Sequence, residues 1–205
     1  MRLVGLYLKS RRASRSVTCL AGVAGLGWLI ARWLLSQPGA SAEGGIPLIL
    51  LLVLPPLYAS VIIGVSSHSP FGDVERSSGR WLPALRLGHL VGLLALGAAG
   101  LSLAALRWDL AHAEWTLARN MLGLAGLALL CALVTGSKLS WIAPLAFGAA
   151  ALLTGLGPDG EPLRWAWLLH AGPDSLAVGM ALGLAAAGLG IVGFYGTAEM
   201  AGEAE

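Results

Sequence analysis

Six long apolar stretches follow one another along the chain, with short polar connections between them. They cover residues 17–35, 46–65, 87–106, 117–135, 139–156 and 176–195. A helix needs about 20 apolar residues to cross the hydrocarbon core of a bilayer. The pattern therefore predicts an all-α fold, a polytopic membrane helical bundle whose six transmembrane helices lie within residues 17–197.

Two residue pairs interrupt these stretches. Pro55 and Pro56 stand in the middle of the second, where each removes a backbone N–H and crowds the preceding turn. We expect a kink or a local break at this hinge position. Arg119 and Asn120 interrupt the start of the fourth stretch, which makes it the weakest of the six. We expect the long Arg119 side chain to snorkel to the membrane surface.

The composition agrees with a membrane environment. Hydrophobic residues make up 57% of the 205 residues and charged residues only 12%, whereas soluble domains are about one quarter charged. A chain this apolar cannot cover itself with polar surface in water. Small residues let helices approach closely in lipid, and the pairs Gly88/Gly92 and Gly179/Gly183 have the required spacing.

The distribution of basic residues predicts the orientation, because cytoplasmic loops carry an excess of Lys and Arg. With the N-terminus in the cytoplasm, nine basic residues fall inside (Arg2, Lys9, Arg11, Arg12, Arg15, Arg76, Arg80, Arg86 and Lys138) and four outside (Arg32, Arg107, Arg119 and Arg164). Six spans then return the acidic tail, residues 198–205, to the cytoplasm. Ala40-Ser41-Ala42 resembles a signal-peptide cleavage site, but the first apolar stretch is longer than usual, so we expect an uncleaved first span.

Two segments outside the spans are unusual. Residues 1–16 mix Leu3, Leu6 and Tyr7 with basic residues, which is typical of a short helix on the cytoplasmic membrane surface; a solvated basic tail is the alternative. Residues 158–173, placed outside, hold Trp165 and Trp167 in an apolar core that is too short to span. They favour a short re-entrant or interfacial helix before the last span, with a tryptophan belt on an ordinary loop as the alternative.

The longest cytoplasmic loop, residues 66–86, is not a plain Gly/Ser linker. Pro70 precedes acidic residues, as at many helix starts. Apolar anchors surrounded by charges indicate docking to another protein, while a self-packed connector anchored by Trp81 is the alternative. The residues assigned to docking are Phe71, Asp73, Val74, Glu75, Arg76, Arg80, Trp81 and Leu82.

Motifs typical of membrane enzymes are missing. The chain has no GxxxxGK[ST] phosphate loop and no HExxH zinc motif. His68 stands near Asp73 and Glu75, but one histidine without a second ligand motif does not predict a metal site. Cys19 and Cys131 lack the spacing of disulfide or zinc frameworks. Ionisable residues are nearly absent from the middle of the spans, which argues against a proton-coupled transporter. We expect no enzyme activity, cofactor, metal or nucleic-acid partner.

These features resemble the membrane subunits of ATP-binding-cassette exporters of the type-2 permease family, in particular small actinobacterial members. The similarity covers the whole chain: an interfacial helix, six spans, a coupling helix in the first cytoplasmic loop and re-entrant helices before the last span. The fourth stretch, with Arg119-Asn120 and Gly123-Leu124, is similar to the fourth span of those members. The loop pattern is carried by Phe71, Glu75-Arg76, Gly79, Leu82-Pro83 and Leu87-Gly88-His89, with Gly79-Arg80 in place of the common Gly-Thr pair.

The resemblance implies a permease subunit in a bacterial plasma membrane that pairs with a separate ABC ATPase subunit and with a second permease, identical or different. The docking residues would lie in a groove of the ATPase, which would hold the ATP and Mg²⁺. ATP-driven dimerisation would then rock the spans between inward- and outward-facing states, provided that ATP binds the two states differently. Two alternatives stay open: a membrane assembly or accessory protein without a transport path, and a membrane-embedded enzyme or another class of transporter.

Overall fold

The computed structural model describes residues 13–36, 46–68, 81–106, 108 and 112–195 of the chain. These residues form six long helices, two short 3-10 turns and one isolated β-bridge between Leu156 and Pro162. The elements are α2 (Ala13–Leu35), α3 (Ile46–Ser66), α5 (Trp81–Ala105), α6 (Ala113–Thr135), η1 (Ser137–Leu139), α7 (Ile142–Thr154), η2 (Trp167–Leu169) and α8 (Ser175–Tyr195).

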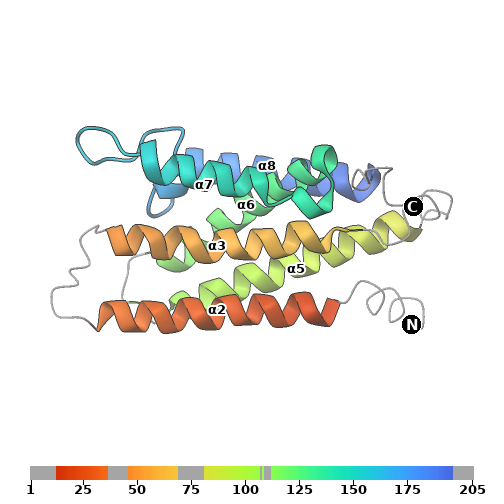
Figure 1. The fold of residues 1–205 in the computed structure, drawn as a ribbon, viewed down its shortest axis with the longest axis horizontal. Helices are drawn as coiled ribbons and strands as arrows, with labels where there is room; N and C mark the ends of the chain where they lie inside the picture. Colours follow the sequence, from red (N-terminus) through yellow and green to blue (C-terminus); the bar gives the residue numbers. More distant parts are fainter. Residues whose placement is uncertain (1–12, 37–45, 69–80, 107, 109–111, 196–205) are drawn as a thin grey trace.

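The helices confirm the predicted all-α membrane bundle. Six apolar stretches of 18 to 23 residues are long enough to cross a membrane, and the fifth joins η1 to α7. Successive helices run in opposite directions, so the start of α2 and the end of α8 lie at the same end of the bundle (Figure 1). The chain is a multi-pass membrane protein by this architecture.

Helix α6 forms the centre of the bundle. It packs against α3, α5, α7 and α8, and 61% of the residues in its most apolar 18-residue stretch are buried. Helix α2 packs against α3 and α5 at the periphery. Only 17% of the residues in its most apolar 18-residue stretch are buried. In Figure 1, α7 and α8 lie at the top, α3 in the middle and α2 at the bottom. The stretch that Arg119 and Asn120 interrupt is therefore the innermost helix.

Glycines allow α6 and α8 to pack with their backbones in contact. A Cβ atom at Gly126 would overlap the backbone of Leu184 in α8. A Cβ atom at Gly188 would lie only 2.6 Å from the carbonyl oxygen of Gly126. Close backbone approach through small residues is a main source of helix association in lipid, and here it fixes α8 on the central helix.

The two glycine pairs expected to mediate such contacts face open space instead. A Cβ atom added at Gly88, Gly92, Gly179 or Gly183 would meet nothing within 4 Å. Within the described part of the chain, these pairs therefore make no close helix contact. Their sides of α5 and α8 are left open to lipid or to another molecule.

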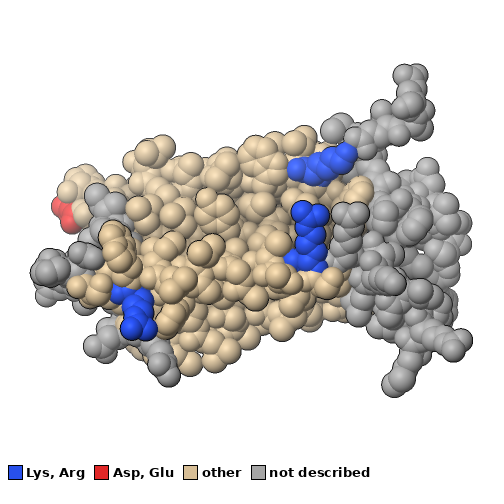
Figure 2. Space-filling view, turned by 60° about the horizontal axis from the view of Figure 1, so that its bottom comes forward, with Lys and Arg blue, Asp and Glu red and all other residues tan. Residues whose placement is uncertain are grey.

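The outer surface is apolar along most of its length. Some of the largest exposed side chains, with exposed fractions of 61–83%, are Leu26, Trp33, Leu103, Leu153 and Phe194. Figure 2 shows a broad uncharged surface with charged side chains towards its two ends. An apolar surface that covers most of the length of a soluble monomer would promote association. In a bilayer such a surface faces hydrocarbon.

Three helices begin four or more residues before the predicted boundaries; one is α6, which begins at Ala113 instead of residue 117. Helix α2 begins at Ala13, so residues 13–16 belong to the first span, and the rest of the predicted surface helix (1–12) lies outside the described residues. Helix α5 begins at Trp81 instead of residue 87, which leaves residues 67–80 as the connection in place of 66–86. Pro83 stands in the first turn of α5, where its missing N–H would be unpaired in any case.

Candidate functional site

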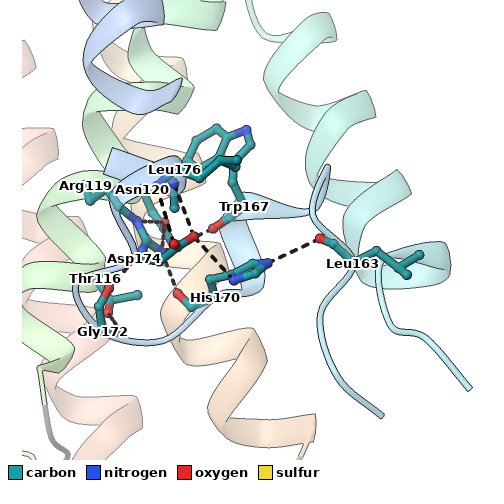
Figure 3. Close-up of polar contacts among 10 residues, drawn as sticks. Thr116, Arg119, Asn120, Leu163, Trp167, His170, Gly172, Asp174 and Leu176 are labelled. Carbon is teal, nitrogen blue, oxygen red and sulfur yellow. Dashed lines mark hydrogen bonds and ion pairs between the residues drawn. The ribbon is translucent and has the colours of Figure 1, made fainter. Parts of the chain in front are cut away.

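Arg119 and Asn120 form the polar centre of the interior. They are consecutive residues in the second turn of α6, and their exposed fractions are 3% and 0%. The prediction that Arg119 snorkels to the membrane surface is wrong. It stays buried because carbonyl groups of the α7–α8 loop, residues 155–174, surround its guanidinium group (Figure 3).

The Arg119 guanidinium binds three carbonyl oxygens of the α7–α8 loop. Nη1 donates to Gly172 at 3.0 Å, and Nη2 donates to His170 at 2.6 Å and to Trp167 at 3.3 Å. Buried backbone groups need hydrogen-bond partners, and loops at membrane depth are tolerated only when protein supplies them. The planar guanidinium offers several donors in a fixed geometry, so Arg119 takes the place of water for this loop.

Asn120 connects the α7–α8 loop to α3. Its Nδ2 donates to the carbonyl oxygens of Leu168 at 2.9 Å and Leu52 at 3.2 Å, while its Oδ1 accepts from Nη2 of Arg119 at 2.9 Å. In a regular helix the carbonyl of Leu52 would pair with the N–H of residue 56. Pro56 has no N–H. Asn120 therefore supplies the donor that this proline removes.

The proline pair does not interrupt α3. The helix continues through Pro55 and Pro56 as a single element, so the local break considered at this position does not occur. Both prolines are buried, and a Cβ atom on Gly27 of α2 would lie 3.4 Å from Cγ of Pro55. Neighbouring helices that satisfy the freed carbonyls make prolines tolerable within a transmembrane helix. The pair is thus a contact point for α6 and α2.

The two predicted tryptophans of the loop have different environments. Trp167 is buried, its ring stacks on Phe147 of α7 at 5.5 Å, and a Cβ atom on Gly123 of α6 would overlap it. Trp165 is exposed and meets Phe147 edge-on at 6.3 Å. Residues 158–173 fold back onto the bundle, but they contain one 3-10 turn and no re-entrant helix.

Gly172 allows the loop to turn towards α6. Its φ of +81° lies in the left-handed region, which favours glycine. Its N–H donates to Oγ1 of Thr116 at 3.1 Å, and the same hydroxyl donates to the carbonyl of His112 at 3.0 Å. Both backbone groups of Gly172 are therefore bound by α6, the carbonyl by Arg119 and the N–H by Thr116.

Asp174 ends the loop and starts α8. Its carboxylate accepts from the N–H groups of Leu176 at 3.4 Å and Ala177 at 3.2 Å, which is the usual arrangement of a helix N-cap. One of its oxygens lies 3.5 Å from Nδ1 of His170. The carboxylate also attracts the charge of Arg119, which offsets part of the cost of burying it.

The predicted docking residues lie mostly outside the described part of the chain. Trp81 and Leu82 are the first two residues of α5, and the structure does not describe their side chains. Next to this connection, Nδ1 of His68 lies 3.0 Å from Oγ of Ser137, which ties the end of α3 to η1. Those that lie outside altogether are Phe71, Asp73, Val74, Glu75, Arg76 and Arg80.

Comparison with known proteins gives no relative for this site. No family model matches the chain, and no curated protein and no solved structure shows significant similarity to it. Among the described residues, no group of three or more His, Cys, Asp or Glu side chains could hold a metal ion. The polar groups around Arg119 and Asn120 bind one another, an arrangement suited to holding segments in position.

The sequence interpretation missed Asn120 as a connecting residue. Two signals pointed to it: a polar pair inside an apolar stretch, which is expensive in lipid and usually has a function, and a proline pair that must leave carbonyl groups without donors. Only the structure shows that the Asn120 amide both belongs to the polar pair and donates to a carbonyl that the prolines leave without a donor.

Proposed function

We propose that this chain is the permease subunit of an ATP-driven exporter of the type-2 ATP-binding-cassette class. A separate ATPase would bind at the end of the bundle that carries residues 67–80, and a second permease would complete the transport path. The observation that supports this proposal most is the bridge from Asn120 to Leu52 of α3 and Leu168 of the α7–α8 loop.

This bridge lies at the end of the bundle that carries the α7–α8 loop, and α3 extends from it to the opposite end. Helix α3 leads into residues 67–80 at one end, while the α7–α8 loop lies at the other (Figure 1). Helix α3 continues as a single element from Leu52 through the two prolines to Ser66. A shift of α3 produced by an ATPase would therefore reach Leu52, and through Asn120 it would pull on Leu168. The α7–α8 loop would respond to events at the far side of the membrane.

The charge distribution supports the same arrangement. Arg15, Arg86 and Lys138 belong to the end of the bundle that carries residues 67–80, which the positive-inside rule places in the cytoplasm. Arg32, Arg119 and Arg164 belong to the opposite end, so the nine-to-four excess comes from basic residues of the sequence that lie outside the described part. An ABC ATPase hydrolyses ATP in the cytoplasm. The docking residues and the excess of basic residues would therefore lie on the side where ATP is available.

Affinity purification of the tagged full-length chain from its native host tests the proposal. The wild-type chain should bring down an ATP-hydrolysing subunit, identified by mass spectrometry. The triple variant E75A/R76A/W81A should lose most of that subunit, because it removes an apolar anchor and two charges of the docking segment. Membrane insertion should stay unchanged, since none of the three residues belongs to an apolar stretch long enough to cross the membrane.

The variant E161A/R164A/W165A is a matched control. It removes the same three residue types from the exposed part of the α7–α8 loop, at the opposite end of the bundle. It should retain the ATPase. Recovery of normal ATPase by E75A/R76A/W81A would disprove the docking assignment, and absence of any ATPase from the wild-type preparation would favour the accessory-protein alternative.

A further inference from the structure

A pocket of about 330 Å³ lies where the last two turns of α2 meet Trp108, just beyond the end of α5. Both helices end on the side of the bundle that carries the α7–α8 loop (Figure 1). The volume is within the range of sites for organic ligands, about 300–1,000 Å³. The pocket is lined by Trp28, Arg32, Leu35, Ser36 and Trp108.

Trp108 brings a buried hydrogen-bond donor without an acceptor to this pocket. The residue is only 2% exposed, and its Nε1 atom has no hydrogen-bond partner in the part of the chain that the structure describes. Its backbone is satisfied, because its N–H donates to the carbonyl of Ala105 at 2.9 Å. An indole N–H can only donate, and a buried tryptophan usually finds a partner for it. The pocket therefore has a place for an acceptor atom.

Arg32 brings a positive charge to the same pocket. Its Cζ atom lies 5.5 Å from the centroid of the Trp28 ring, which is a cation–π contact. Among the described residues, no hydrogen bond or ion pair uses its guanidinium group. The contact with Trp28 thus holds the charge beside the pocket and leaves the N–H donors of the guanidinium for another group.

The end of α2 does not need the Arg32 side chain for capping. Basic side chains near a helix C-terminus can donate to the last carbonyl groups. Here Ser36 does so: its N–H lies 3.2 Å from the carbonyl oxygens of Arg32 and Trp33, and its Oγ donates to Trp33 at 2.7 Å. The guanidinium is available to a ligand.

The two unused donors favour a ligand with negatively charged oxygen atoms. No acidic side chain is among the described residues that line the pocket. Arg32 belongs to the last turn of a candidate membrane span, the level at which lipid head groups lie. Next to it on α2, Leu29, Ile30 and Trp33 are more than half exposed and offer an apolar surface to acyl chains.

We propose that this pocket binds the phosphate of a phospholipid head group. Nε1 of Trp108 and the Arg32 guanidinium would donate to phosphate oxygens, while the acyl chains would lie along the exposed side of α2. A soluble phosphate compound has the same acceptor atoms but has no use for the apolar surface beside the pocket. Phospholipid binding here is independent of any transport activity.

NMR of the full-length chain with isotope-labelled tryptophan tests the proposal. The protein is purified free of lipid in an uncharged detergent, and the indole signal of Trp108 is the one that Trp108→Phe removes. Phosphatidylglycerol should shift that signal downfield, because the indole N–H gains a charged acceptor. Diacylglycerol with the same acyl chains lacks the phosphate, and glycerol phosphate lacks the acyl chains. At the same concentration, neither should shift the signal.

Matched variants make the test specific. Arg32→Gln should need about tenfold more phosphatidylglycerol for the same shift, because it removes the charged donor. Arg32 is exposed, so this variant should unfold at the wild-type temperature. Trp108→Phe keeps an aromatic ring without the N–H and should retain about tenfold less phosphatidylglycerol in native mass spectrometry. Arg164→Gln and Trp165→Phe change exposed residues at the same end of the bundle and should behave as the wild type does.

Three outcomes would overturn the proposal. An unshifted Trp108 signal with phosphatidylglycerol, or an equal shift with diacylglycerol, would mean that the pocket does not recognise phosphate. An equal shift with glycerol phosphate would assign the pocket to a soluble phosphate compound instead of a lipid. An equal loss of lipid in the Arg164→Gln and Trp165→Phe variants would mean that head groups bind this end of the bundle without a specific pocket.

Discussion

At the scale of single residues, one amide determines how three segments meet. Asn120 donates to Leu52 in α3 and to Leu168 in the α7–α8 loop, and it accepts from Arg119. Removing it would leave two carbonyl groups and part of a guanidinium group without partners in a buried site. An unsatisfied buried polar group is more harmful than a lost hydrogen bond between exposed groups.

Replacing Asn120 with leucine should lower the stability of the folded chain by about 1–2 kcal/mol. The measurement is reversible unfolding in detergent, followed by circular dichroism. Met121→Leu is the control, because Met121 is the next residue of α6, is fully buried and changes little in volume. If the two variants unfold together, the amide contributes nothing to stability.

A double-mutant cycle identifies the Leu52 carbonyl as a partner of the amide. Pro56→Leu restores the backbone N–H that the carbonyl of Leu52 lacks. The destabilisation caused by Asn120→Leu should therefore be smaller in a Pro56→Leu background than in the wild type. Strictly additive effects would show that the two positions are not connected.

The partners of Arg119 could not be predicted from the sequence, for a physical reason. Its carbonyl acceptors lie 48 to 53 residues further along the chain. The hydropathy of a stretch describes the transfer of that stretch alone from water to lipid. It contains no information on the hydrogen-bond acceptors that another segment provides. Snorkelling was the expectation because it needs no partner. The α7–α8 loop provides a buried alternative.

At the scale of elements, apolar length predicted the six helices because spanning a bilayer is a local property of each stretch. Their starts were less well predicted. Pro47, Pro83 and Pro144 each stand in the first turn of a helix: α3, α5 and α7. Proline is favoured there because its fixed φ suits a helix and its missing N–H costs nothing. The position of Pro83 could have placed the start of α5 correctly.

The contact between α6 and α8 predicts opposite effects of two similar substitutions. Alanine favours a helix over glycine by about 1 kcal/mol. Gly126→Ala should nevertheless destabilise the chain, because its Cβ would overlap the backbone of Leu184. Gly183→Ala, with open space around it, should be neutral or stabilising. Thermal unfolding of both variants in detergent measures the difference; a stabilised Gly126→Ala variant would contradict the packing.

At the scale of the whole molecule, the alternation of helices predicts which connections share a side of the membrane. A cysteine at Glu43 should react with a membrane-impermeant maleimide added to intact cells. One at Ser78 should react only after the cells are opened. Cys19 and Cys131 are first replaced with alanine so that the reagent has a single target. The reverse labelling pattern would invert the proposed orientation, with the ATPase side exchanged for the outside.

The position of each helix in the bundle could not be predicted from its apolar length. Arg119 and Asn120 make the fourth stretch the least apolar of the six predicted spans at its start, yet α6 is the innermost helix. Those two polar residues are tolerable only where other segments surround them, so their presence in an apolar stretch indicates a central position. Helix α2, with no such residues in its middle, lies at the edge.

The hydrogen bonds of α6 also impose an order on the synthesis of the protein. Helix α3 leaves the ribosome with the carbonyl of Leu52 unpaired until Asn120 follows, 68 residues later. The carbonyl groups that bind Arg119 are synthesised later still, 48 to 53 residues further along the chain. An arginine inside a transmembrane helix costs up to about 3 kcal/mol at the insertion channel. A nascent chain that ends before Trp167 would therefore leave Arg119 in α6 without any of its three loop carbonyls.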